Sequence, residues 1–366
     1  MLTTLVGMPL GALDTPALLV DIEAMDRNIA RLAGTMRARG VNWRPHAKGH
    51  KCPTITHRQI AAGAIGVTVA KVSEAEVMAS SGIMDILIAN QVVGPIKTRR
   101  LAGLIAATGA DPIVAVDNPA NVRELDDAAA AFGVRPRVVV EVDSGMQRCG
   151  VAPGEPTIAL ARMVDASPHL RFAGLMAWEG HTVSMKDHPT RREEIKKAVG
   201  RLTAAADEVR AAGLPVDIVS CGGGGTYVHA VDQPGITEIQ AGGATMGDGF
   251  YRDLEAQVEP ALTLLTTVTS RPSKDRLILD AGRRAIDPSQ KPPALRGVEG
   301  VKSMRFSAEH GVVALDGPSE WPRVGDRLEI EVNYTDQAVH LHENLFGIRD
   351  GVIAAVWPVA CRGKMQ

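Results

Sequence analysis

The chain has 366 residues, of which 45% are hydrophobic and 22% charged, and its 40 Lys and Arg against 42 Asp and Glu leave a net charge of -2. This composition is that of an ordinary globular protein and excludes a disordered, collagen-like or coiled-coil chain. The balanced charge provides no excess of cations for holding a polyanion, so a nucleic-acid partner is not expected.

The first 20 residues are mildly apolar but do not predict a membrane span. They include Pro9, Asp14 and Pro16, and they have neither a basic start nor an apolar run long enough to cross a bilayer. The chain also has four cysteines far apart, with no CxxC pair, which argues against a structural zinc site or a disulfide framework. We therefore expect a cytoplasmic protein with reduced thiols and no membrane partner.

Short runs of β-branched residues recur along the first two thirds of the chain and predict eight strands. These runs are 41–45, 66–70, 86–90, 113–116, 137–142, 172–178, 216–220 and 237–241. Ala- and Leu-rich segments with apolar residues at helical spacing lie between them, at 73–80, 121–131, 155–166 and 191–212. Eight strands alternating with helices predict an α/β fold, a (β/α)8 TIM barrel, over residues 21–254.

After residue 255 the pattern changes to strands without long helices. The runs are 262–268, 276–279, 312–315, 327–332 and 352–357, separated by turns such as Arg271-Pro272-Ser273 and Asp350-Gly351. This pattern predicts a C-terminal antiparallel β domain over residues 255–366. Residues 1–20, with a strand at 17–20, are expected to join it.

Polar residues and glycines gather just after the predicted strands, where a barrel places its active site. Turns in any protein are rich in such residues, which accounts for one cluster by itself but not for six at one edge. The clusters are 45–51, Asn90, 143–148, 178–181, 221–226 and 240–243.

Two glycine turns follow the last two predicted strands. The first is Cys221-Gly222-Gly223-Gly224-Gly225-Thr226 and the second is Gly242-Gly243. Unhindered backbone N–H groups in this position suit a phosphate, although a plain flexible turn is the alternative. Neither turn matches GxxxxGK[ST] or a convincing dinucleotide fingerprint, so a nucleotide ligand is not expected.

Lys48 lies three residues past the first predicted strand, between His46 and His50. Neighbouring cations and partial burial lower the pKa of a lysine and free its amine for a Schiff base with an aldehyde. By itself the run could be a solvated basic loop. Together with the phosphate seat it indicates pyridoxal phosphate (PLP) as cofactor.

Several motifs in order make the chain similar to a known family. They include LDTPALLVD near the start, RPHAKGHK at 44–51, KVSEAE at 71–76, EVDSGMQRCGV at 141–151, EIQAGG at 238–243, LDAGRRA at 279–285 and EHG at 309–311. With these, the chain resembles the D-threonine aldolase and D-serine dehydratase family over residues 13–363. The resemblance implies a fold-type III PLP enzyme, with an alanine-racemase-like barrel and a C-terminal β domain.

The resemblance also implies which residues hold the cofactor. Lys48 would form the Schiff base and Arg148 would contact the ring oxygen. The other implied contacts are His46, Trp178 and Gln240 and, at the phosphate, Gly224, Gly225, Thr226, Gly242 and Gly243. His181 is predicted to be a proton acceptor near the reacting carbon, and a loop histidine with a structural hydrogen bond is the alternative.

One departure from the family pattern concerns a divalent metal. Relatives carry a His-x-Cys or His-x-Asp pair that binds the metal, and the alignment puts Tyr334 and Asp336 at those two positions. On a regular strand His340 would share a face with Asp336 but lie about 13 Å away, at ~3.3 Å per residue. Either the site is rebuilt with Asp336 and His340, preferring a hard ion such as Mg or Mn, or this branch works without the metal.

The favoured function is the PLP-dependent retro-aldol cleavage of a D-threonine-like D-β-hydroxy-α-amino acid to glycine and an aldehyde. The main alternative is a dehydratase that releases a keto acid and ammonia. A racemase is less favoured because no second base opposite the lysine is identified, and the extra β domain argues against a PLP carrier. The resemblance also implies a homodimer. Threonine, phenylserine and 3-hydroxyaspartate analogues all remain open as substrates.

Overall fold

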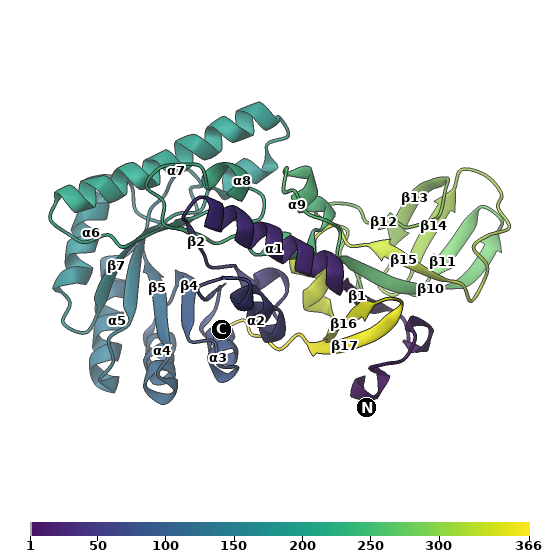
Figure 1. Ribbon diagram of the computed structural model, residues 1–366, viewed down its shortest axis with the longest axis horizontal. Helices are drawn as coiled ribbons and strands as arrows, with labels where there is room; N and C mark the ends of the chain where they lie inside the picture. Colours follow the sequence, from purple (N-terminus) through teal and green to yellow (C-terminus); the bar gives the residue numbers. More distant parts are fainter. Residues whose placement is uncertain (1) are drawn as a thin grey trace.

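The structure is a computed structural model that describes residues 2–366. Figure 1 shows an α/β barrel at one end and a β domain at the other, with α1 (Ile22–Ala38) lying across the junction. Within residues 2–366, no helix combines the length and the apolar character needed to cross a membrane.

The barrel consists of eight parallel strands in the order β2-β9-β8-β7-β6-β5-β4-β3. They are β2 (Asn42–Trp43), β3 (Val67–Val69), β4 (Asp85–Gln91), β5 (Asp111–Val116), β6 (Arg137–Glu141), β7 (Arg171–Met176), β8 (Ile218–Cys221) and β9 (Glu238–Ile239). A parallel bridge between His46 and Thr68 joins the two outer strands, and the N–H of Thr68 donates to Pro45 O at 2.9 Å. The predicted barrel is therefore confirmed, and each predicted run overlaps one of its strands.

Helices cover the outside of this sheet. They are α2 (Pro53–Ala61), α3 (Val72–Ser80), α4 (Pro95–Thr108), α5 (Pro119–Phe132), α6 (Glu155–Ala166) and α7 (His188–Ala211). α1 shows how the sequence specifies such a helix, because Asp21 accepts a hydrogen bond from Ala24 N at its start and apolar side chains recur every three or four residues. The buried stripe includes Ile22, Met25, Ile29, Leu32 and Met36.

A ring of six charged residues closes the amino-terminal end of the barrel. Its members are Arg44, Asp85, Asp111, Arg137, Arg171 and Glu238, and all except Arg44 are the first residue of a strand. Arg44 lies 2.8 Å from both Asp85 and Glu238, and its side chain is 2% exposed. Burying a charge is costly without a partner, so this pairing lets Arg44 and Glu238 be ionised in the core, whereas Asp111 and Arg171 are about half exposed.

The second sheet has nine strands and includes the N-terminal strand, as predicted. They are β1 (Ala17–Asp21), β10 (Leu262–Ser273), β11 (Arg276–Leu279), β12 (Ala294–Leu295), β13 (Val301–Phe306), β14 (Gly311–Leu315), β15 (Arg327–Glu331), β16 (Asn344–Arg349) and β17 (Val352–Pro358). All pairings are antiparallel except β1 with β16, which is parallel. The sheet is therefore mixed rather than purely antiparallel.

Two local predictions in this domain are wrong. The predicted turn Arg271-Pro272-Ser273 forms the end of β10, whose register against β11 shifts twice, at Val268/Ser270 and Ser270/Ser273. Such irregularities accommodate a proline that cannot donate to the ladder. The segment around Asp336, treated above as a strand, is instead helical: α10 (Thr335–Ala338) is followed by η6 (Val339–Leu341).

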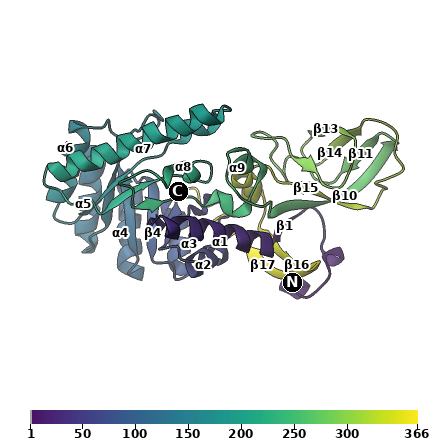
Figure 2. The ribbon, with the colours of Figure 1, turned by 45° about the horizontal axis from the view of Figure 1, so that its top comes forward.

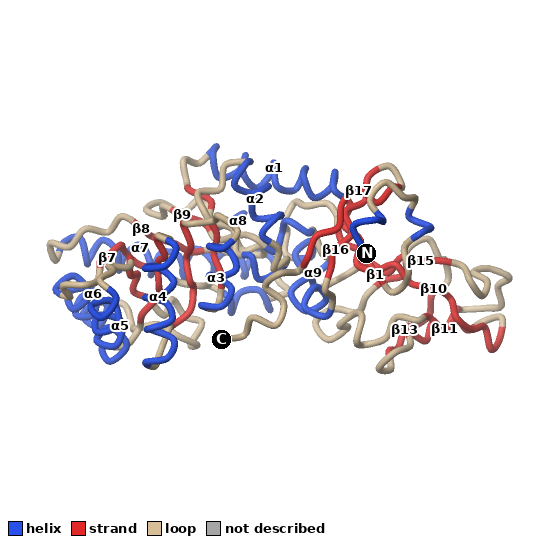
Figure 3. Tube along the Cα trace, turned by 90° about the horizontal axis from the view of Figure 1, so that it is seen from below, coloured by secondary structure: helices blue, strands red, loops and turns tan. Residues whose placement is uncertain are grey.

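Contacts between the two bodies gather at the barrel mouth. α9 (Gly249–Asp253) lies between barrel and β domain in Figure 2, and α10 packs against η3 (Ala47–Gly49), the turn after β2. The N–H of Thr335 donates to Asp248 Oδ2 at 2.6 Å. The chain then returns to the barrel, where Ser73 N donates to Gln366 O and the C terminus lies near α3 (Figure 3). The β domain thus supplies side chains to the carboxyl end of the barrel.

Candidate active site

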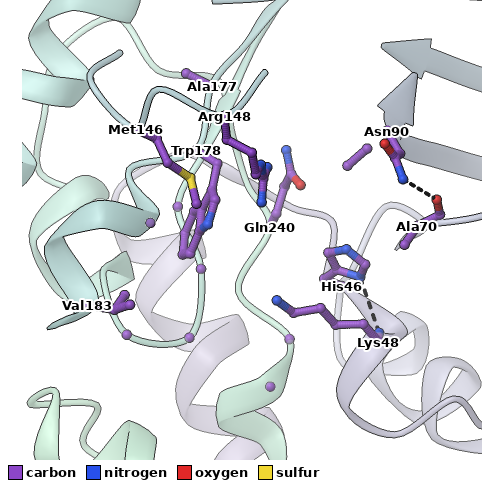
Figure 4. Close-up of a pocket in the computed structure, with 18 of the residues that line it drawn as sticks. His46, Lys48, Ala70, Asn90, Met146, Arg148, Ala177, Trp178, Val183 and Gln240 are labelled. Carbon is purple, nitrogen blue, oxygen red and sulfur yellow. Dashed lines mark hydrogen bonds between the residues drawn. The ribbon is translucent and has the colours of Figure 1, made fainter. Parts of the chain in front are cut away.

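A cavity of about 500 Å³ opens at the carboxyl ends of the barrel strands. All but one of the predicted cofactor residues line it, namely His46, Lys48, Arg148, Trp178, Gly224, Gly225, Gln240, Gly242 and Gly243. Figure 4 shows Lys48 and His46 on one side of the cavity and Trp178, Met146 and Val183 on the other, with Arg148 and Gln240 between them. The polar residues that follow separate strands therefore converge, as their place in the barrel predicts.

Lys48 sits on the short turn η3, directly after the strand that begins the barrel. The turn is fixed by His46, whose Nδ1 accepts a hydrogen bond from Lys48 N at 3.2 Å. Burial, together with the nearby cation of Lys48, keeps the pKa of His46 well below its usual value, so this ring is a neutral acceptor. The Lys48 side chain is 42% exposed, and its Nζ lies 3.4 Å from Asp336 Oδ2.

The two glycine turns form a cradle that no side chain could occupy. A Cβ atom at Gly243 would lie 2.5 Å from the Tyr251 ring, one at Gly224 would lie 2.7 Å from the same ring, and one at Gly242 would lie 2.2 Å from His46 O. Among residues 2–366, the N–H groups of Gly224 and Gly225 have no hydrogen-bond acceptor. Unpaired N–H groups in a glycine turn are what a phosphate requires.

Thr226 is the predicted phosphate residue that does not line the cavity. Its hydroxyl donates to Glu179 Oε1 at 2.5 Å and accepts from Gly223 N at 2.9 Å. Glu179 is 1% exposed, and burial raises the pKa of its carboxyl. Thr226 and Glu179 therefore brace the glycine turn from behind. The sequence analysis placed Glu179 in the polar cluster 178–181 but gave it no role.

Arg148 and Glu141 form a second polar group, of which the sequence analysis predicted only Arg148. Arg148 Nη2 lies 3.8 Å from Glu141 Oε1, and Gln91 Nε2 donates to Glu141 Oε2 at 2.5 Å. Glu141 is nearly buried, which raises the pKa of its carboxyl. Arg148 thus has Glu141 as a distant ion-pair partner, and its exposed side faces the cavity.

Trp178 and His181 follow β7 but differ in position. The Trp178 ring would collide with a Cβ at Gly180 or Gly223, so it packs flat on these glycines and forms a wall of the cavity. His181, on η4 (Gly180–Ser184), does not line the cavity, since its ring packs against Gly145 and its Nδ1 is buried without a hydrogen-bond partner among residues 2–366. Its role as proton acceptor stays a prediction.

The residues around Asp336 do not fit a divalent metal. Because the segment is helical, the strand spacing assumed for His340 does not apply, and His340 does not line the cavity. Burial and the carboxylates of Asp336 and Asp248 raise the pKa of Tyr334, so its phenol is a neutral donor. Within residues 2–366, no three His, Cys, Asp or Glu side chains are placed to share an ion.

PLP, in contrast, fits the cavity. A reactive amine, a glycine cradle with unpaired N–H groups, and the Arg148 cation all face the same space. The volume is within the range of ~300–1,000 Å³ typical of small-molecule sites.

Comparisons with known proteins agree with this geometry. Residues 20–249 match the family model "Alanine racemase, N-terminal domain", and residues 261–348 match "Putative serine dehydratase domain". The chain is 36% identical to D-threonine aldolase of Arthrobacter sp, covering 98% of this chain and 95% of that protein. It is 34% identical to 3-hydroxy-D-aspartate aldolase of Paracoccus denitrificans (strain Pd 1222), covering 98% and 94%.

A solved structure extends the similarity to three dimensions. The crystal structure of D-threonine aldolase from Filomicrobium marinum superposes with a TM-score of 0.94 at 36% identity, covering 99% of this chain and 98% of that one. The similarity includes both the barrel and the β domain. The chain therefore belongs to the D-threonine aldolase and D-serine dehydratase family.

Proposed function

We propose that this protein is a PLP-dependent lyase that cleaves a D-β-hydroxy-α-amino acid into glycine and an aldehyde. The observation that supports this most is the position of the Lys48 amine, in a cavity between a glycine cradle and the Asp336 carboxylate. Two aldolases among its relatives support the same reaction class.

The residues that would hold the cofactor are those that line the cavity. Lys48 would bind it through its amine, the N–H groups of Gly224 and Gly225 would hold its phosphate, and Arg148 would face its ring oxygen. The chemistry that PLP supplies when bound is an electron sink beside the α carbon of an amino acid. Thr226 would act indirectly, by fixing the glycine turn.

The protein's own task is to manage protons and to exclude water. Retro-aldol cleavage removes the proton of the β-hydroxyl and returns a proton to the α carbon. Lys48 is the basic amine of the cavity and lies beside the carboxylate of Asp336, so the pair can hold a proton close to the reacting carbon. Trp178, Met146 and Val183 form an apolar wall that limits the access of water.

Product analysis tests this proposal. The cofactor-loaded protein is mixed with D-threonine, and we expect glycine and acetaldehyde in equal amounts. A dehydratase would release 2-oxobutanoate and ammonia instead, and this outcome would overturn the aldolase assignment. A racemase would instead invert the α carbon of D-threonine and give L-allo-threonine, and an absence of any amino-acid turnover would indicate a carrier.

Assembly and location are also part of the proposal. We propose a cytoplasmic homodimer without a nucleic-acid partner, which the family resemblance and the balanced net charge of -2 support. Light scattering coupled to size-exclusion chromatography measures the assembly directly. The divalent ion stays a prediction from the sequence, and the donor set described above argues against it.

A further inference from the structure

Asp336 occupies an unusual position for a metal ligand, because it lies behind the reactive lysine. Its side chain is 13% exposed and does not line the cavity, whereas Lys48 does. Asp336 Oδ2 is 3.4 Å from Lys48 Nζ, and Oδ1 is buried without a hydrogen-bond partner among residues 2–366, close to the backbone of Gly49. The carboxylate therefore faces the Lys48 amine rather than the cavity.

The surroundings of this carboxylate are poorly suited to a cation. The Lys48 amine lies 3.4 Å from Asp336 Oδ2, so a cation bound at this oxygen would lie close to the Lys48 charge and be repelled by it. Mg²⁺ demands near-octahedral oxygen ligands, and Mn²⁺ prefers similar donors. The nearby Asp248 is already engaged, since its two oxygens accept hydrogen bonds from Tyr251 N and Thr335 N. Asp248 is thus not available to complete a cation site with Asp336.

The two histidines downstream do not complete a site. His342 Nε2 lies 2.7 Å from Ala285 O, so this ring is used in packing the β domain. His340 is on η6 and is absent from the cavity lining. Tyr334 does line the cavity, and its ring packs edge-on against Phe250 with centroids 5.3 Å apart. An aromatic ring thus occupies the place where an imidazole would be needed.

We propose that Asp336 is a positioning residue for Lys48, and that cleavage by this protein needs no divalent ion. This inference rests on the proposed function. The carboxylate holds the Lys48 amine at the cavity wall by charge and keeps its proton available. Once the substrate amine had displaced Lys48, the freed neutral amine would take up the proton of the β-hydroxyl as the Cα–Cβ bond breaks, and would then return this proton to the α carbon. Protons then balance without a Lewis acid.

The first experiment measures the metal directly. The holoenzyme is dialysed against EDTA, its metal content is determined by elemental analysis, and D-threonine cleavage is followed with and without added Mn²⁺. We expect a metal content far below one ion per chain and a change in kcat of less than about twofold. One tightly bound ion per chain, with activity lost on its removal and restored by Mn²⁺, would overturn the inference.

The second experiment separates positioning from mere structure. We expect Asp336→Asn to lower kcat about tenfold or more with little change in KM, and to slow the bond formation between added PLP and Lys48, seen as visible absorbance. Asp336→Glu should restore part of both. Gln337→Ala, an exposed neighbour on the same helix, is the matched control. If Asp336→Asn keeps both rates while His181→Ala loses them, the proton partner is His181 and the inference is wrong.

The third experiment tests whether the absence of a divalent ion is explained by Tyr334, which stands where relatives carry a metal-binding His. Tyr334→His adds an imidazole two residues before Asp336, and we expect this variant to gain Mn²⁺ binding by calorimetry, with Tyr334→Phe as control. Equal Mn²⁺ binding by the unaltered protein would contradict us. The proposed function fails separately, if D-threonine gives no glycine under any metal condition while the cofactor spectrum is normal.

Discussion

The charged side chains at the two ends of the barrel differ in how closely they are paired. At the amino-terminal end, each of the six charged side chains has an opposite charge within 3.0 Å. At the carboxyl end the pairs are looser, 3.4 Å for Lys48 with Asp336 and 3.8 Å for Arg148 with Glu141. Polar atoms buried there without a hydrogen-bond partner within residues 2–366 include Asp336 Oδ1, His181 Nδ1 and Ser144 Oγ. At the amino-terminal end Arg44 Nη1 and Arg137 Nε also lack a hydrogen bond of good geometry within these residues, but each lies within 3.0 Å of a carboxylate oxygen.

This difference indicates that the amino-terminal end of the sheet serves stability and the carboxyl end serves function. A buried polar atom without a partner costs roughly 1–3 kcal/mol, which a domain tolerates only where the group is needed for something else. The amino-terminal ring satisfies its own charges and leaves nothing for a ligand. The carboxyl end leaves an amine, a guanidinium and backbone N–H groups for a ligand, and the ring at the other end helps to keep the barrel closed around them.

The largest expected effect is at the carboxyl end. Lys48→Ala should abolish turnover and the visible absorbance of bound cofactor, because no other amine lines the cavity within residues 2–366. The free energy of unfolding should change little, since this side chain is half exposed. Absorbance and product assays measure both, with Lys196→Ala on the surface of α7 as control. An unchanged visible spectrum would remove Lys48 from its central role.

The opposite result is expected at the amino-terminal end. Arg44→Ala leaves the buried Glu238 without its ion-pair partner, whereas Asp85 keeps Arg137, and breaking a buried pair costs about 3–5 kcal/mol. Urea unfolding should show this loss, while the folded fraction keeps its kcat. A variant that lost activity without losing stability would contradict the division between the two ends.

Much of this division was predictable from the sequence, because it depends on local patterns. The eight β-branched runs marked the strands, and the polar clusters after them marked the edge where Lys48, Arg148 and the glycine turns meet. The amino-terminal ring was not predicted. Its ion pairs join residues such as Arg44 and Glu238, 194 positions apart, and no periodicity reports which strands are neighbours.

The segment after Tyr334 shows a different limit. Thr335, Ala338 and Val339 are buried at helical spacing, but residues 339–342 also alternate apolar and polar as a strand would. So short a stretch fits both periods, and docking against η3 selects the helix. The contact between Lys48 and Asp336 depends on that docking, so sequence reasoning could name both residues without foreseeing that they pair.

A smaller effect is expected from the glycine cradle. Gly243→Ala places a Cβ 2.5 Å from the Tyr251 ring, so the turn or the ring must shift and PLP should bind about tenfold more weakly. Fluorescence titration with PLP measures the affinity. Gly200→Ala, on α7 where a Cβ meets nothing within 4 Å, is the matched control and should stabilise the protein by about 0.5–1 kcal/mol. Equal affinity in both variants would mean that the cradle does not hold the phosphate.

The last expected effect is a pH dependence of stability that arises at the carboxyl end. Burial is the largest influence on Asp248 and raises its pKa from 3.8 to about 6. Between these values the folded protein binds the proton that the unfolded chain has released, so this group stabilises the fold below pH 4 and the contribution is lost as the pH rises through about 6.

Asp248→Asn tests this by removing the titrating group. The variant should be less stable at every pH, because an amide nitrogen cannot accept the hydrogen bonds from both Tyr251 N and Thr335 N, but its free energy of unfolding should fall less between pH 4 and 6 than that of the unaltered protein. Urea unfolding at several pH values measures the slope. An unchanged slope would mean that Asp248 is ionised throughout, so that the carboxyl end tolerates a buried charge as well as the paired ring does.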